Sequence, residues 1–177
     1  MKQKLLLILI LCLTISSLKG QGFNILQTKR TVNDKQKLAA YITLIDTLVW
    51  NETQLDECKL YIKEAQKLAT KLGADEDKLL IDLFALLRNF YTNEGDVLKW
   101  IEDNERMYLQ SKFPLLKAKY YLFAGIVREN KGLVGLHYFT SARKIYEKES
   151  IVNNIDKYLL DTYYRLTIFY RYSEMID

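Results

Sequence analysis

The most constraining feature of this sequence is a recurring spacing of large and small residues, repeated four times at intervals of about 40 residues. Each copy opens with a large apolar or aromatic residue, and a second apolar residue follows three positions later. The four openings are Ile42-x2-Ile45, Phe84-x2-Leu87, Tyr121-x2-Ala124 and Tyr163-x2-Leu166. A repeat of this length is typical of a solenoid of helical hairpins, in which each hairpin packs only against its neighbours. The repeat therefore predicts a fold that offers a surface to partners.

The residues after position 20 favour an all-α fold. Pro114 is the only proline of the chain, and apolar residues recur at three- and four-residue spacing, the period of a helix with one buried face. The few glycines mark the expected joints, at Gly73, Gly95 and Gly132. Short connections make neighbouring helices pack antiparallel. We expect seven helices, with ends placed to within about two to four residues, at 34–50, 53–72, 76–93, 96–112, 115–131, 134–149 and 155–173.

The repeated spacing resembles the tetratricopeptide repeat, whose first helix carries W-x2-L-G-x2-Y and whose second carries A-x3-F. The third repeat fits this pattern best, and its matching segments are Tyr121-x2-Ala124-Gly125 and Gly135-x3-Phe139-x2-Ala142. The pattern departs from the family at three small-residue positions, where this chain has Asp46, Arg88 and Trp100. The whole resembles the exported N-terminal repeat domain of bacterial regulators of this family.

The resemblance implies a right-handed superhelix of antiparallel hairpins over residues 34–177, preceded by a short extension at 21–33. In such hairpins small residues let two helices approach closely, and large residues fill the space between hairpins. We expect Gly125, Gly135 and Ala142 to be close-packing positions and Phe139 to be a filler. Cys58 takes the place of Gly135 in the first repeat, so we expect a buried thiol and not a reactive one.

Residues 1–20 have the three parts of a secretory signal peptide. A basic start at Met1–Lys4 precedes an apolar run from Leu5 to Ile15 and a small, polar exit that ends at Gly20. We expect cleavage after Gly20 and an exported protein, periplasmic or secreted. The apolar run is shorter than the ~20 residues that span a bilayer, so no stable membrane span remains after cleavage. A retained signal anchor is the alternative.

The expected cleavage removes most of the net positive charge. The chain has 26 Lys and Arg against 22 Asp and Glu, and residues 1–20 hold three lysines and no acid. Subtraction leaves 26 − 3 = 23 cations against 22 anions, a net charge of +1. A nearly neutral chain with no basic stripe argues against nucleic acid as a partner.

The sequence offers little for catalysis or metal binding. After cleavage Cys58 is the one cysteine and His137 the one histidine of the chain, too few for the usual four-ligand zinc site. No nucleophile elbow, phosphate-binding loop or HExxH motif is present. The acidic run Asp75–Asp77 fits a helix start, with Asp75 as the N-cap. We therefore expect no enzyme activity, no metal and no cofactor.

The resemblance places partner contacts on the first helix of each hairpin, which lines the concave face in the family. The residues expected to contact a partner are Trp50, Asn89, Asn93, Ile126, Glu129, Asn130, Tyr164, Ile168 and Arg171. Asn51, Asn93 and Asn130 recur at equivalent places. They have a second interpretation as left-handed caps that end the first helices, because Asn tolerates that conformation.

The segment 158–172 is apolar on nearly all sides and rich in tyrosine. Exposed apolar patches mark association sites, so we expect self-association through this segment. The sequence as a whole predicts an exported helical-repeat protein that binds a protein or peptide, either on its own or as the truncated sensory module of a larger regulator. The alternative is a helical module that binds a small ligand or a carbohydrate, since exposed tyrosines also stack on sugars.

Overall fold

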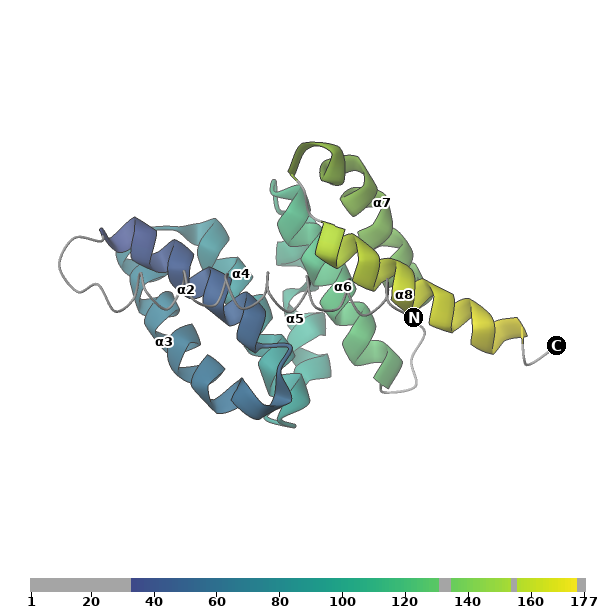
Figure 1. Ribbon diagram of the computed structural model, residues 1–177, viewed down its shortest axis with the longest axis horizontal. Helices are drawn as coiled ribbons and strands as arrows, with labels where there is room; N and C mark the ends of the chain where they lie inside the picture. Colours follow the sequence, from purple (N-terminus) through teal and green to yellow (C-terminus); the bar gives the residue numbers. More distant parts are fainter. Residues whose placement is uncertain (1–32, 131–134, 154–155, 175–177) are drawn as a thin grey trace, which may run out of the picture. The chain divides into compact units, whose positions relative to one another are not determined.

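The computed structural model describes residues 33–130, 135–153 and 156–174, and these residues form helices joined by short connections, with no strand among them (Figure 1). Seven α-helices and one 3-10 helix lie within the described ranges: α2 (Asp34–Leu48), η1 (Glu52–Gln54), α3 (Leu55–Leu72), α4 (Asp75–Tyr91), α5 (Val97–Leu109), α6 (Pro114–Asn130), α7 (Leu136–Asn153) and α8 (Asp156–Glu174). The prediction of an all-α chain with seven helices is confirmed. The expected signal peptide, residues 21–32 and the joint at Gly132 lie outside the described residues.

The chain divides into two compact units between Arg88 and Asn89, a point inside α4. In the first unit α2 packs against α3. In the second unit α6 packs against both α5 and α7, and α8 packs against α7. Each unit is therefore built from helices that are neighbours in the sequence, as the short connections predict.

Local capping residues set several helix ends. Asn33 accepts a hydrogen bond from the Gln36 backbone N–H at 2.9 Å, and the Gln36 side chain accepts one from the Asn33 N–H, which together form a capping box. Gly73 ends α3 in the left-handed conformation at φ 61°. Asn93 has φ 54° just after α4. The left-handed interpretation of Asn93 is confirmed.

Two expectations about helix ends need correction. Asn51 is extended (φ −113°) and caps η1 by accepting a hydrogen bond from the Thr53 N–H, because the chain makes a separate turn there before α3. Asp75 is the first helical residue of α4 and not its N-cap, since the Lys78 N–H already bonds to the Ala74 carbonyl. The sixth expected helix, 134–149, ends four residues before the end of α7, which is within the range allowed for helix ends.

Cys58 lies in the core of the first unit, with no exposed surface. Burial raises the pKa of its thiol to about 11, outweighing the opposite effect of nearby Arg88. Arg88 is itself buried. Its Nε donates to the Leu55 carbonyl at 3.4 Å, and Nη2 lies 3.7 Å from Asp56 Oδ1, so the guanidinium packs against the start of α3. The packing interpretation of Cys58 is confirmed.

A phenyl ring fills the space between two glycines in the second unit. A Cβ added at Gly125 of α6 would lie 2.6 Å from Phe139 Cε1, and one added at Gly135 would lie 3.0 Å from Phe139 Cε2. Neither position therefore leaves room for a side chain beside the ring. Phe139 and Ala142 are fully buried. The expected close-packing positions and their filler are confirmed.

Candidate partner-binding surface

The last helix, α8, has a buried face that holds it on the second unit. Tyr158, Thr162 and Leu166 recur every four residues and are all buried, which is the spacing of one helix face. The Tyr158 ring stacks against Tyr146 of α7 with centroids 6.0 Å apart. The Lys119 ammonium of α6 lies 3.8 Å from the centroid of the same ring. These contacts fix which side of α8 faces inward.

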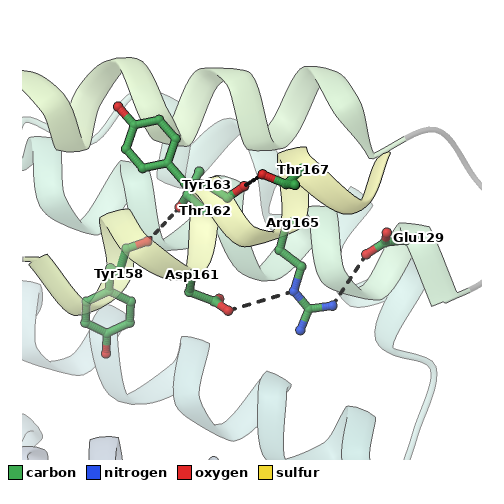
Figure 2. A network of polar contacts seen from close by, with 7 residues as sticks. All are labelled: Glu129, Tyr158, Asp161, Thr162, Tyr163, Arg165 and Thr167. Carbon is green, nitrogen blue, oxygen red and sulfur yellow. Dashed lines mark hydrogen bonds and ion pairs between the residues drawn. The ribbon is translucent and has the colours of Figure 1, made fainter. Parts of the chain in front are cut away.

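A polar network ties α8 to α6 along one edge of that buried face (Figure 2). Arg165 Nη1 lies 3.5 Å from Glu129 Oε2 of α6, and Arg165 Nε lies 3.9 Å from Asp161 Oδ1 one turn earlier. All three side chains are partly buried. Half-exposed pairs of this kind contribute up to ~1 kcal/mol each, so the network mainly sets the rotation of α8 about its axis.

The other edge of α8 contacts α7 through Tyr163. Its hydroxyl donates a hydrogen bond to Glu147 Oε1, and that bond, more than desolvation, raises the pKa of Tyr163. Arg143 Nε lies 3.6 Å from the same Glu147 oxygen. Figure 2 shows Tyr163 on the side of α8 opposite Arg165 and Asp161. The residues between these two edges are left facing solvent.

We call these solvent-facing residues the outward face of α8. Its members share exposure and a three- or four-residue spacing, and they are Leu160, Tyr163, Tyr164, Thr167, Tyr170 and Arg171. Leu160 is 66% exposed, Tyr164 62% and Tyr170 51%. Only Leu60 and Met107 are further large apolar side chains exposed in the described part of the chain. The outward face therefore gathers most of the large apolar surface that the described residues leave uncovered.

Three of the sequence-predicted contact residues meet on α8. Tyr164, Ile168 and Arg171 follow an i, i+4, i+7 spacing, so they share one stripe of the helix. Tyr164 and Arg171 are exposed and Ile168 is half-buried. Glu129 lies at the neighbouring end of α6, where it is occupied by its pair with Arg165. The sequence pattern thus places part of the expected surface together.

The remaining predicted contact residues do not join this stripe. Ile126 is 1% exposed and belongs to the core, which corrects the expectation that it faces a partner; α6 is covered on this side by other helices. Asn130 ends α6, and its side chain lies outside the description. Trp50 and Asn89 are half-buried and Asn93 is exposed, on the segments after α2 and around the end of α4.

The expected contact residues did not include Leu160, Tyr163, Thr167 and Tyr170 of the outward face, although all four lie in the segment 158–172 that was expected to self-associate, and they did not include Glu147 of α7. Positions 160, 163, 167 and 170 follow the alternating three- and four-residue steps of one helix face, a signal that could have singled them out. No signal in the sequence marks Glu147, since its place beside Tyr163 depends on how α7 packs on α8.

Other kinds of site are poorly supported in the described part of the chain. No group of three or more His, Cys, Asp or Glu side chains is placed there to hold a metal ion. No helix among the described residues is long and apolar enough to cross a bilayer. A hollow of about 540 Å³ on α3 is lined by Lys63, Gln66, Lys67 and Thr70 and is open to solvent, whereas small-molecule sites enclose most of their ligand.

Comparison of the chain with protein-family models, curated proteins and solved structures yields no significant match.

Proposed function

We propose that this chain is an exported helical-repeat protein that binds a protein or peptide partner through the outward face of α8. One observation supports this most: Leu160, Tyr164 and Tyr170 are large, mostly uncovered and on one face of one helix. Aromatic side chains are common anchors of protein interfaces because they bury much area at low entropic cost.

The proposal includes the architecture. The hairpins stack in a right-handed superhelix like that of the tetratricopeptide repeats, and no chemistry is carried out. The ring of Phe139 between Gly125 and Gly135 supports this arrangement, because it is the kind of small-and-large packing that the repeat pattern predicts. A small-angle scattering profile of the exported chain, compared with profiles calculated for superhelical and extended arrangements of the two units, tests the architecture.

A matched pair of leucines tests the binding surface. Leu60 on α3 and Leu160 on α8 are 64% and 66% exposed, so the same change to Glu removes a similar amount of apolar surface at each. Peptides selected from a displayed library against the exported chain should bind Leu160→Glu at least ~10-fold more weakly, the effect of losing one interface anchor. Leu60→Glu should bind them within about two-fold. Equal affinities of the unchanged chain, Leu160→Glu and Leu60→Glu for these peptides would contradict the proposed surface.

Export is tested separately. N-terminal sequencing of the protein recovered outside the cytoplasm should begin at or near Gln21, because the signal-peptide pattern ends at Gly20. An intact Met1 on that protein would contradict the proposal.

The alternative, a small-ligand or carbohydrate module, has its own measurement. Native mass spectrometry of the purified chain should show the mass of the polypeptide alone if the main proposal holds. A retained small molecule or glycan, lost on Tyr164→Ala, would favour the alternative.

A further inference from the structure

We draw no further inference here: the strongest candidate, the exposed outward face of α8 around Leu160, Tyr164 and Tyr170, belongs to the surface already described, and nothing in the described part of the chain shows what covers it.

Discussion

The helices α6 and α8 of the second unit look alike in sequence and differ in what covers them. Both are long and apolar on several sides. From Leu122 to Val127 every residue of α6 is buried. On α8, buried Tyr158, Thr162 and Leu166 alternate with the exposed residues of the outward face. Apolar character alone therefore does not say whether a helix is in the core.

The difference between the two helices follows from their neighbours. α6 has α5 and α7 packed against it, and Arg165 of α8 reaches its Glu129. α8 packs on α7. It contacts α6 through the pair of Arg165 with Glu129 and through the Tyr158 ring, over which Lys119 of α6 lies. The hydrophobic effect scales with the area removed from water. An apolar side chain buried on α6 therefore stabilises the fold strongly, whereas the same side chain on the outward face of α8 contributes little. The predictions below test that contrast.

The largest effect is expected at the ring between the two glycines. Phe139→Ala removes a fully buried side chain that touches α6, and should lower the free energy of unfolding by ~3–5 kcal/mol. Tyr170→Ala, which removes an aromatic side chain that is half exposed on α8, should change it by less than ~0.5 kcal/mol. Urea unfolding followed by far-ultraviolet circular dichroism measures both. A similar loss in the free energy of unfolding for Phe139→Ala and Tyr170→Ala would contradict the contrast between the buried α6 contact and the exposed face of α8.

Overpacking the same place should cost less. A leucine in Gly135→Leu would start from a Cβ 3.0 Å from the Phe139 ring and 3.2 Å from the Gly125 carbonyl, and should lower the free energy of unfolding by ~1–3 kcal/mol. The control is the double variant with Phe139→Ala. Removing the ring makes room, so the two losses should not add. An unchanged melting temperature in the single variant would mean that the hairpin relaxes freely.

Cys58 extends the comparison to the first unit. Cys58→Ala removes one buried sulfur and should cost about 1 kcal/mol, less than Phe139→Ala because fewer buried atoms are lost. The folded thiol should be alkylated by iodoacetamide much more slowly than in urea, because burial holds its pKa near 11. Rapid alkylation of the folded chain would contradict the buried position.

The same thiol gives a pH dependence with a definite sign. In the unfolded chain it ionises near its ordinary pKa of 9.0, and in the folded chain near 11. The unfolded state therefore loses the proton first, and this part of the stability is complete below pH 9 and is lost as the pH rises toward 11. Stability should fall less between pH 9 and 11 in Cys58→Ala than in the original chain. Equal slopes in chemical denaturation would contradict this cause.

The smallest effect on folding is expected on the outward face. Tyr164→Glu should change the free energy of unfolding by less than ~0.5 kcal/mol, because the side chain is already 62% exposed. Its effect should appear in association instead, as weaker binding of the selected peptides. A large loss of stability would show that Tyr164 is buried in solution and would contradict the assignment of α8 as a helix with an uncovered face.

Helix positions could be predicted closely because their signals are local. Gly73 and Asn93 adopt the left-handed conformation that ends a helix, and Asn33 makes a side-chain cap that its residue type favours. The end of α7 was placed too early, at 149, because residues 150–153 carry no glycine or proline to mark a stop. Asn51 was assigned the wrong cap, because its extended backbone depends on the separate turn of η1.

The candidate surface could be predicted only in part. The stripe of Tyr164, Ile168 and Arg171 follows from helical spacing alone. Ile126 occupies the equivalent place on α6, yet it is buried, and the repeat pattern does not distinguish the two. Leu160 and Tyr163 belong to the segment 158–172, which the sequence marks as apolar on nearly all sides, but which of its residues are exposed depends on the helices that pack against α8. Glu147 becomes part of the surface only through its hydrogen bond with Tyr163.

The helical class, most helix ends and the small residues at Gly125 and Gly135 could be predicted from the amino-acid sequence. Those properties depend on hydrogen bonds four residues apart, on backbone preferences and on the apolar period, all of which are local. Only the packing of the helices showed that Ile126, which was expected to face a partner, lies in the core, and which residues of the apolar segment 158–172 face solvent. Burial is a property of what other helices cover, and that depends on contacts between segments far apart in the chain.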